Sequence, residues 1–256
     1  MTRIPEAFKN GKAFIAFITG GDPDLEITEK LLYTMSEAGA DIIEIGIPFS
    51  DPIAEGPVIQ AASQRALEAG CTTDKLFELV AKVRKDISIP LVFMTYINPI
   101  YTYGKDKFMK RCKEVGIDGV IVPDLPFEEK GELAPECEKY DVDLISLIAP
   151  TSHERISMIA KEAKGFVYWV SSLGVTGVRT EITTDVGAMT KLVRENSDIP
   201  CAIGFGISTP EQAAKMSQSA DGVIVGSAIV RIVGENGRDS IEPVRDYVKS
   251  MKAAIS

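Results

Sequence analysis

Short apolar runs recur at intervals along this chain and predict buried strands. The runs are rich in Ile, Val and Phe and are often bounded by Gly or Pro. Most of them lack strict polar alternation, which is typical of parallel strands that are covered on both faces. The eight runs are residues 13–19, 41–47, 90–96, 118–124, 143–149, 166–172, 200–206 and 221–227.

The segments between these runs have the apolar spacing of amphipathic helices. In residues 24–38, for example, Leu31, Leu32 and Met35 recur at helical intervals. Several segments also follow a Ser, Thr or Asp that can cap a helix. The predicted helices are residues 24–38, 73–85, 105–115, 127–140, 153–163, 185–196, 210–217 and 241–254.

The alternation of strands and helices predicts an α/β fold, a (β/α)8 TIM barrel with extra helical elements. No linker, low-complexity tract or charge block interrupts the chain, so we expect a single domain over residues 1–256. The connection at residues 48–89 has room for an extra helix. A doubly wound sheet is the alternative, but it usually has fewer strands and a Gly-rich turn after the first strand, which this chain lacks.

Composition and charge narrow the classes of function. The formal net charge of −9 argues against nucleic acid as the main partner, because phosphate backbones recruit a surplus of Lys and Arg. The four cysteines are widely spaced without a CxxC pair and His153 is the only histidine, so we expect reduced thiols and no metal site. The first 21 residues hold only a short apolar run, so we expect neither a signal peptide nor a membrane span, and a cytoplasmic location.

One carboxylate, Glu44, interrupts the apolar run at residues 41–47. Alternate residues of a strand share a face, so Glu44 lies on the same face as Ile42 and Gly46. If that face points into the barrel, apolar neighbours raise the pKa of Glu44 and make it a candidate acid–base group. The alternative is a structural carboxylate paired with a basic residue, but the predicted strand ends contain no Lys or Arg.

Active sites of barrels form where the strands end, and this chain carries further polar and Gly-rich positions there. Asp51 and Glu55 follow the Glu44 strand and supply possible second carboxylates, although a solvated surface loop explains them as well. Asp22 and Asp124 suit structural or helix-capping roles equally well.

The last two strands end in glycines that predict a phosphate site. Barrels often hold a phosphate between the loops after strands seven and eight, at the amino end of a short helix. The candidates are Gly204 and Gly206 after the seventh run and Gly226 and Ser227 after the eighth. The alternative is that these glycines only relieve crowding where the barrel closes.

Seven motifs, in order over essentially the whole chain, carry a family resemblance. They are FITGGDPD, EIGIPFSDPIAEGPVIQ, YINPIYTYG, VPDLPFEE, SSLGVTGVR, GFGIS and GSAIV. The chain resembles the alpha subunit of tryptophan synthase. The resemblance implies a (β/α)8 barrel that cleaves indole-3-glycerol phosphate to indole and glyceraldehyde 3-phosphate in tryptophan biosynthesis. It also implies no cofactor in this chain. A pyridoxal-phosphate beta subunit is the implied partner, in an alpha2-beta2 complex, and receives indole through a tunnel.

The resemblance assigns roles to individual residues. Glu44 matches the catalytic glutamate, which protonates the indole at C3 and assists proton removal from the glycerol hydroxyl. Glu55 matches the carboxylate that holds the indole N–H. Matches to substrate-binding residues are Phe17, Tyr168, Thr176, Gly177, Gly204, Gly206, Gly226 and Ser227. Matches to the surface that faces the beta subunit are Asp51, Pro52, Tyr96 and Asn98. Residues 48–89 and 174–185 contain the candidate lids.

Position 55 is the main departure from the family pattern, which has Asp where this chain has Glu. The extra methylene moves the carboxylate by roughly 1 Å, and a misplacement of that order can cost about a hundredfold in rate. Either the loop backbone compensates, or the protein mainly binds ligand and activates its partner. A stand-alone lyase that releases free indole is a third hypothesis.

Overall fold

The strands close into a parallel barrel. The computed structural model describes residues 2–150, 152–170, 186–204 and 206–256, and within them the strand order is β5-β4-β3-β2-β1-β9-β8-β7-β6. The strands at the two ends of that order, β5 and β6, are consecutive in the chain and separated only by Ile145. The fifth predicted strand is therefore present but broken, and it completes the barrel. Closure confirms the barrel and excludes the doubly wound alternative.

The strand bounds follow the apolar runs closely, because these runs are buried on both faces. The first run, residues 13–19, is a strand over its full length and is buried throughout. The strands are β1 (Ala13–Thr19), β2 (Ile42–Gly46), β3 (Leu91–Met94), β4 (Gly119–Ile121), β5 (Asp143–Leu144), β6 (Ser146–Ile148), β7 (Val167–Val170), β8 (Cys201–Gly204) and β9 (Gly222–Val225).

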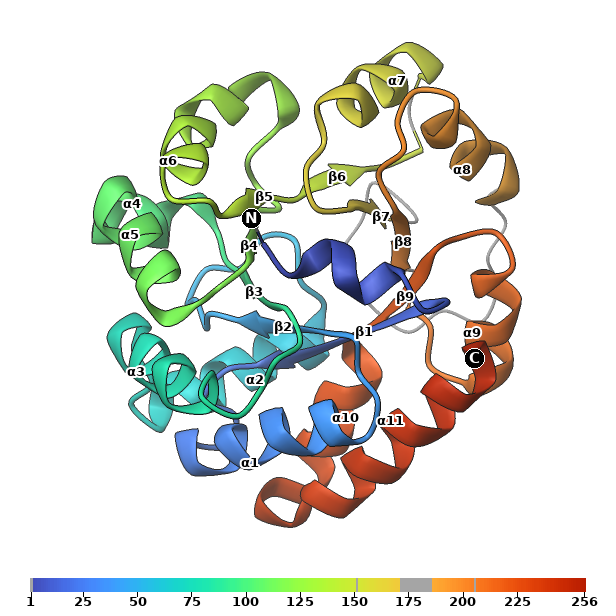
Figure 1. The fold of residues 1–256 in the computed structure, drawn as a ribbon. Helices are drawn as coiled ribbons and strands as arrows, with labels where there is room; N and C mark the ends of the chain where they lie inside the picture. The colour runs from blue at the N-terminus through green and yellow to red at the C-terminus, as the bar shows by residue number, and fades with distance from the viewer. Residues whose placement is uncertain (1, 151, 171–185, 205) are drawn as a thin grey trace.

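Helices surround this barrel as a ring in Figure 1. They are α1 (Leu25–Glu37), α2 (Pro57–Glu68), α3 (Thr73–Val83), α4 (Ile97–Tyr103), α5 (Lys105–Val115), α6 (Ala134–Lys139), α7 (His153–Glu162), α8 (Val186–Arg194), α9 (Pro210–Ser217), α10 (Ser227–Asn236) and α11 (Ile241–Ile255). The short 3-10 helices are η1 (Ile4–Phe8), η2 (Phe127–Glu132) and η3 (Gly237–Asp239). Within the described residues, no helix is long and apolar enough to cross a membrane.

Helix prediction differs from the structure at three places. The helix predicted at residues 127–140 is split at the buried Leu133 into η2 and α6. α10 follows β9 without a side-chain cap and continues its apolar run, so periodicity alone did not separate the two. α4 was missed because its amino end is capped from a distant loop. Its first backbone N–H, that of Ile97, donates to Asp124 after β4 at 2.9 Å. α2 occupies the room predicted for an extra helix.

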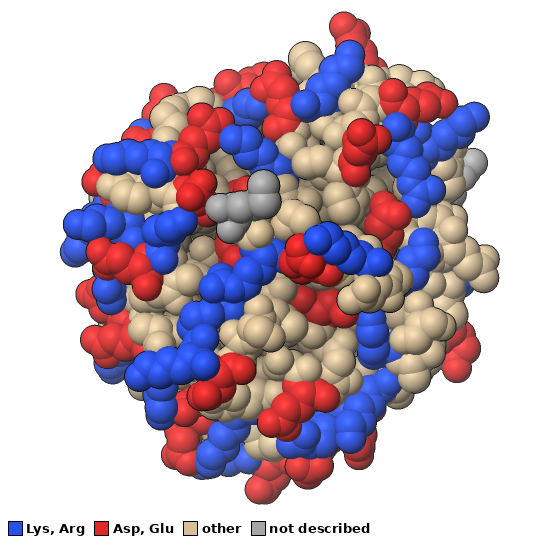
Figure 2. All heavy atoms as spheres, in the orientation of Figure 1, with Lys and Arg blue, Asp and Glu red and all other residues tan. Residues whose placement is uncertain are grey.

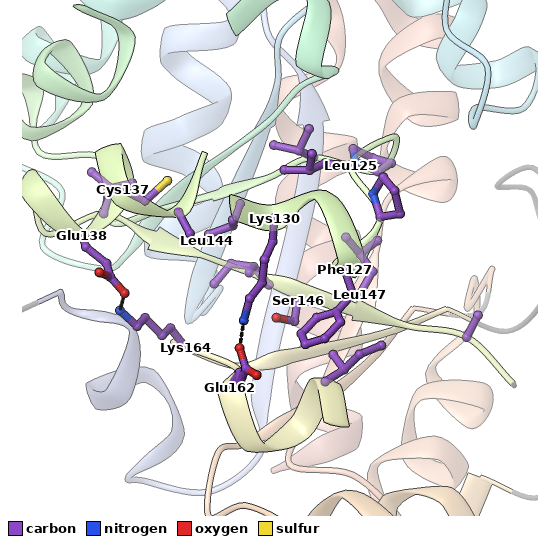
Figure 3. A pocket seen from close by; sticks show the side chains of 18 of the residues that line it. Leu125, Phe127, Lys130, Cys137, Glu138, Leu144, Ser146, Leu147, Glu162 and Lys164 are labelled. Atoms are coloured by element: carbon purple, nitrogen blue, oxygen red, sulfur yellow. Dashed lines mark hydrogen bonds and ion pairs between the residues drawn. The ribbon is translucent and has the colours of Figure 1, made fainter. Parts of the chain in front are cut away.

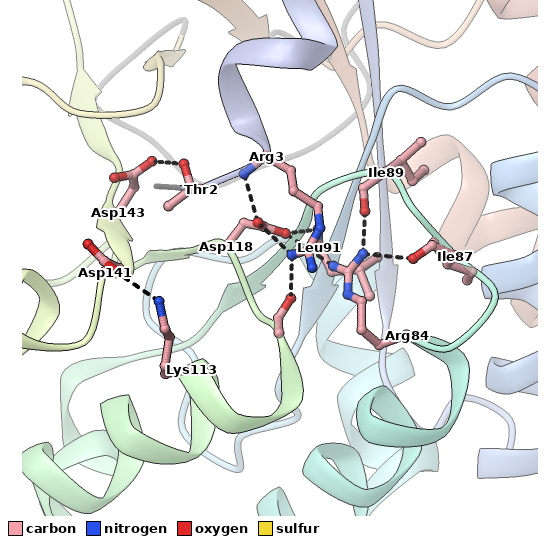
Figure 4. Close-up of polar contacts among 11 residues, drawn as sticks. Thr2, Arg3, Arg84, Ile87, Ile89, Leu91, Lys113, Asp118, Asp141 and Asp143 are labelled. Carbon is pink, nitrogen blue, oxygen red and sulfur yellow. Dashed lines mark hydrogen bonds and ion pairs between the residues drawn. The ribbon is translucent and has the colours of Figure 1, made fainter.

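The amino end of the barrel is plugged, which leaves the carboxyl end as the mouth. Ile4 of η1 is fully buried, and next to it Asp118 accepts hydrogen bonds from the guanidinium groups of Arg3 at 3.0 Å and Arg84 at 3.1 Å (Figure 4). The backbone N–H groups of Arg3 and Leu91 also donate to Asp118. The buried carboxylate of Asp118 thus accepts hydrogen bonds from four donors, and buried charges are normally paired in this way.

The face that carries the amino terminus shows no single-sign region. Lys and Arg side chains alternate there with Asp and Glu in Figure 2. Mixed charges of this kind do not form the basic stripe that nucleic-acid recognition needs. The visible face therefore agrees with the inference drawn from net charge.

Candidate active site

Glu44 lies inside the barrel without a charged or hydrogen-bonding partner. It is centred on β2, in register with Phe17 of β1 and Val92 of β3. Its side chain has no solvent exposure, and neither carboxylate oxygen has a hydrogen-bond partner among the described residues. The contrast with Asp118, which has four donors, excludes a structural ion pair for Glu44 within the described part of the chain.

The environment of Glu44 keeps its carboxyl group protonated. Burial among apolar side chains raises the pKa of Glu44 to about 8, because desolvation penalises the charged form. Glu44 in turn helps to raise the pKa of the buried Tyr168 hydroxyl, although burial is the larger cause. At neutral pH the barrel interior thus contains a carboxylic acid with a transferable proton close to the phenol of Tyr168.

Two aromatic rings shape the mouth beside Glu44, and glycines make room for them. A Cβ on Gly46 would lie 2.7 Å from the ring of Phe17, and one on Gly204 would lie 2.8 Å from the Tyr168 hydroxyl. A Cβ on Gly226 would lie 3.3 Å from Phe17. Relief of crowding therefore accounts for part of the glycine pattern. Gly206 has a different reason, since its φ of +67° lies in the left-handed region that favours glycine.

The amino end of α10 supplies backbone donors at the same mouth. Gly226 precedes the helix without a side-chain cap, and the first intrahelical bond there runs from the N–H of Val230 to the carbonyl of Gly226. The earlier N–H groups of the first turn have no intrahelical acceptor, as at any helix start, and the helix dipole adds positive potential. The hydroxyl of the buried Ser227 lies in this turn. The structure therefore brings Gly226 and Ser227 together with Phe17. The binding of a phosphate at this helix start stays a prediction.

Glu55 is the second carboxylate with an unusual environment. It lies in the loop between β2 and α2, and its Oε2 is buried without a hydrogen-bond partner among the described residues. Burial raises the pKa of Glu55 to about 7. Its backbone carbonyl accepts from the Gln60 side chain at 2.7 Å, which ties the loop to the first turns of α2.

Tyr96 anchors the loop that carries Glu55 through a hydrogen bond and a ring contact. Its hydroxyl accepts a hydrogen bond from the backbone N–H of Ala54 at 2.9 Å, and its ring lies 5.4 Å from that of Phe49. Burial raises the pKa of Tyr96 to about 12, with Glu55 and Asp124 as lesser causes. Tyr96 is only 3% exposed in this chain, so it supports the loop from inside. Its place at a partner interface stays a prediction.

The other residues expected at a partner interface lie around that loop. Asp51 and Asn98 are exposed and Pro52 is half-buried. The neighbouring Ile53 is 75% exposed, which is unusual for a large aliphatic side chain. Thr176 and Gly177, expected near the substrate, fall outside the described residues, as does the candidate lid at 174–185.

Asp22 and Asp124 have structural partners. Arg65 of α2 donates to Asp22 through two nitrogens, each at 2.8 Å, which joins α2 to the end of β1. Asp124 caps α4, as described above. In the described part of the chain, no group of three or more His, Cys, Asp or Glu side chains is placed to hold a metal ion.

Comparison with known proteins places these features in a family. The sequence profile described as "Tryptophan synthase alpha chain" matches residues 6–256. The chain belongs to the tryptophan synthase alpha chain family. The alpha chain of Lacticaseibacillus casei is 46% identical over 255 residues, covering 100% of this chain and 96% of the relative. The alpha chain of a Thermoanaerobacter strain is 48% identical over 262 residues, with full coverage of both.

Solved structures agree with this membership. A chain of tryptophan synthase from Mycobacterium tuberculosis superposes with a TM-score of 0.90 at 33% identity, over 99% of this chain and 98% of that one. The alpha subunit from Legionella pneumophila gives a TM-score of 0.88 at 36% identity, over 100% and 98%. An alpha chain is one part of a synthase, so membership of the tryptophan synthase alpha chain family also indicates a partner beta chain.

The apolar wall of the mouth contains residues that the sequence analysis did not single out. Phe17 packs against Ile59 and Ala62 of α2, Val230 of α10 and Met94 of β3. The inward alternation of β3 was the available signal for Met94. For Ile59, Ala62 and Val230 the sequence contained no such signal, because only the folded barrel brings α2 and α10 against β1.

Removing the Tyr96 hydroxyl tests how firmly the loop is held. We expect Tyr96→Phe to lower kcat/KM for indole release by about fivefold, since the lost hydrogen bond is worth roughly 1 kcal/mol and frees the residue before Glu55. The ring contact with Phe49 stays, so folding is preserved. Steady-state kinetics measures the effect, with Tyr140→Phe as the matched control, because it removes a hydroxyl at the end of α6 that donates to Asp106. Unchanged kcat/KM in Tyr96→Phe would show that this bond does not position Glu55.

Proposed function

We propose that this chain is the carbon–carbon lyase of a tryptophan synthase, cleaving indole-3-glycerol phosphate to indole and glyceraldehyde 3-phosphate. The observation that supports it most is Glu44, a fully buried, unpaired carboxyl whose pKa is raised to about 8. A neutral acid inside an apolar, aromatic-lined mouth suits protonation of an indole carbon.

The proposed reaction is a retro-aldol cleavage in which Glu44 gives one proton and takes another. Its carboxyl protonates indole C3, and the resulting carboxylate accepts the proton of the hydroxyl on the attached glycerol carbon. The bond between C3 and that carbon then breaks, its electrons return to the indole ring, and the carbon becomes the aldehyde of glyceraldehyde 3-phosphate. Glu44 ends protonated again. The indole leaves only once C3 is protonated, which is why a buried acid is needed.

The remaining candidates bind and orient the substrate in this proposal. Phe17 and Tyr168 contact the indole. The phosphate lies between the loop at Gly204–Gly206 and the amino end of α10, where Ser227 adds a hydroxyl. Thr176 and Gly177 complete the substrate site. The glycerol chain spans the distance between Glu44 and the phosphate.

Glu55 takes the place of the family's aspartate in this scheme. Its ionised carboxylate accepts the indole N–H as positive charge develops on the ring nitrogen. The Tyr96 bond to the preceding residue and the Gln60 bond to Glu55 itself fix the loop backbone on both sides of the carboxylate. This anchoring supports a loop that is adapted to the longer side chain.

The partner and cofactor belong to the same proposal. We infer an alpha2-beta2 complex in which Asp51, Pro52 and Asn98 face the beta subunit, with Tyr96 behind them. The alpha reaction uses acid–base groups of this chain, and pyridoxal phosphate is expected in the partner. The exposed Ile53 on the same loop supports a covered surface there.

The pH dependence of indole release tests the two carboxylates together. Glu55 must be ionised, so kcat/KM is expected to rise with pH through about 7, and Glu44 must be protonated, so it should fall above about 8. The control is Glu55→Gln, which should be slower and lose the acidic limb while keeping the alkaline one. An acidic limb that persists in Glu55→Gln would contradict the role given to Glu55.

A further inference from the structure

A cavity of about 240 Å³ lies outside the barrel wall, away from the mouth. It is bordered by the broken strand β5/β6 on one side and by η2, α6 and α7 on the other (Figure 3). Its walls combine apolar side chains such as Leu125, Phe127 and Leu144 with charged ones. The charged lining residues are the cations Lys130, Arg155 and Lys164 and the acids Glu138 and Glu162. None of the described residues assigned to the alpha reaction lines it.

The cavity has a cause in the sequence. Most residues that point outward from the strands are apolar and several are large, such as Phe93, Trp169 and Ile203, and they pack under the helices. On β6 the outward positions are Ser146 and Ile148, since Ile145 and Leu147 pack in the interior cluster, and Ser146 is the small polar one. The helix above it is also short, because residues 127–140 split into η2 and the six-residue α6. A small polar residue under a short helix leaves the space unfilled.

The rim of the cavity carries cations that are held only weakly. Lys130 pairs with Glu162, and Lys164 pairs with Glu138 at 2.7 Å. Both glutamates are more than half exposed, at 54% and 62%. Exposed pairs of this kind are worth roughly 0–1 kcal/mol, so a second carboxylate can replace Glu162 or Glu138 at little cost.

We propose that this cavity is a binding site for a small aromatic carboxylate. A cavity of about 150 Å³ lined by aliphatic and aromatic residues is enough for benzene, so the volume here suits one or two fused rings. The ring lies between Phe127, Leu144 and Ile159, and the carboxylate replaces Glu162 on Lys130. The hydroxyl of Ser146 faces the same space and gives a second polar contact (Figure 3). The apolar body and single charge of the ligand follow from this lining.

The proposed carboxylate site does not depend on the proposed lyase function, but it lies close to Tyr168 of the proposed active site. Leu147, next to Ser146, pairs in register with Tyr168 on the neighbouring strand. A bound acid would therefore lie one strand away from the active-site tyrosine. Binding can be measured without any assay of turnover.

The test is titration calorimetry with 2-naphthoate as the probe and the uncharged 2-naphthamide beside it. We expect 2-naphthoate to bind with one site per chain and 2-naphthamide about fivefold more weakly, because the pair formed with Lys130 contributes roughly 1 kcal/mol. Lys130→Met should reduce the affinity for 2-naphthoate by a similar factor. The matched control is Lys191→Met, which removes an exposed lysine on α8 that does not border this cavity.

A second experiment fills the cavity from the position of Ser146. Ser146→Leu introduces a large apolar residue of the kind that several other strands carry outward, and it should abolish binding while leaving the thermal midpoint equal or higher. No binding of 2-naphthoate to the natural chain, or equal binding to Lys130→Met, would overturn the proposal. Undiminished binding to folded Ser146→Leu would overturn it as well, because the probe would then occupy another place.

Discussion

Glu44→Gln is expected to lower the rate of carbon–carbon cleavage by about 10²–10⁴-fold, the usual contribution of a positioned acid–base group. The amide keeps the size of the side chain but cannot give a proton to indole C3 or take one from the glycerol hydroxyl. The proposed phosphate site at α10 and the walls formed by Phe17 and Tyr168 are untouched. Single-turnover indole release measures the rate, and calorimetry with indole-3-glycerol phosphate measures binding.

Two further variants test whether the loss of rate is specific to the carboxyl group of Glu44. Glu154→Gln removes an exposed carboxylate at the start of α7 and should leave the rate unchanged. Glu44→Asp keeps an acid but withdraws it by roughly 1 Å, and we expect it to lose about a hundredfold. Near-normal turnover in Glu44→Gln would assign the acid to another group. Loss of binding together with turnover would give Glu44 a folding role.

The same substitution should stabilise the protein at high pH. The pKa of Glu44 is raised from 4.5 to about 8 by burial, so the folded state holds a proton that the unfolded state releases. Its contribution to stability is full below pH 4.5 and is lost as pH rises through about 8. Gln does not ionise, so the stability of Glu44→Gln relative to the natural chain should increase by on the order of 4 kcal/mol between pH 5 and pH 9.

Urea unfolding at the two pH values measures this difference. Other groups titrate in both proteins and cancel in the comparison. The control, Glu154→Gln, should show a difference that does not change with pH. A constant difference for Glu44→Gln as well would mean that Glu44 is ionised in the folded protein, and the acid role would then fail. The acid that serves the reaction therefore lowers alkaline stability.

The fold was largely predictable from the sequence because parallel barrel strands are buried on both faces. Continuous apolar runs mark such strands directly, and the β1 run was correct to the residue. Strand alternation also put Glu44 on one face with Ile42 and Gly46, but the fold was needed to show that this face points into the barrel. The break at Ile145 was not predicted, because the run at residues 143–149 is apolar at most positions and a single serine, Ser146, does not mark the end of a strand.

The features that depend on distant contacts were not predictable. Tyr96 looked like a surface residue, yet it is buried because the loop before α2 folds over it and donates a backbone hydrogen bond to its hydroxyl. α4 required a cap from Asp124, in the loop after β4. The cavity under α6 required a serine on β6 to meet a helix that splits at Leu133. Each of these joins segments that are far apart in the sequence.

Position 55 shows the limit of a motif comparison. The change from the family's aspartate is visible in the sequence, but its consequence depends on the loop backbone. The structure shows that loop fixed by Tyr96 and Gln60, with a buried carboxylate oxygen and a pKa raised to about 7. Replacing a short acid by a longer one is compatible with catalysis only where such anchoring exists.

The central claim is that this chain cleaves indole-3-glycerol phosphate, and product formation tests it most directly. The pure chain, alone and with a beta chain of tryptophan synthase, is incubated with the substrate at pH 7.5, and indole and glyceraldehyde 3-phosphate are both quantified. We predict equal amounts of the two products, formed faster with the partner present. If neither mixture forms indole, the chain is not the lyase proposed here.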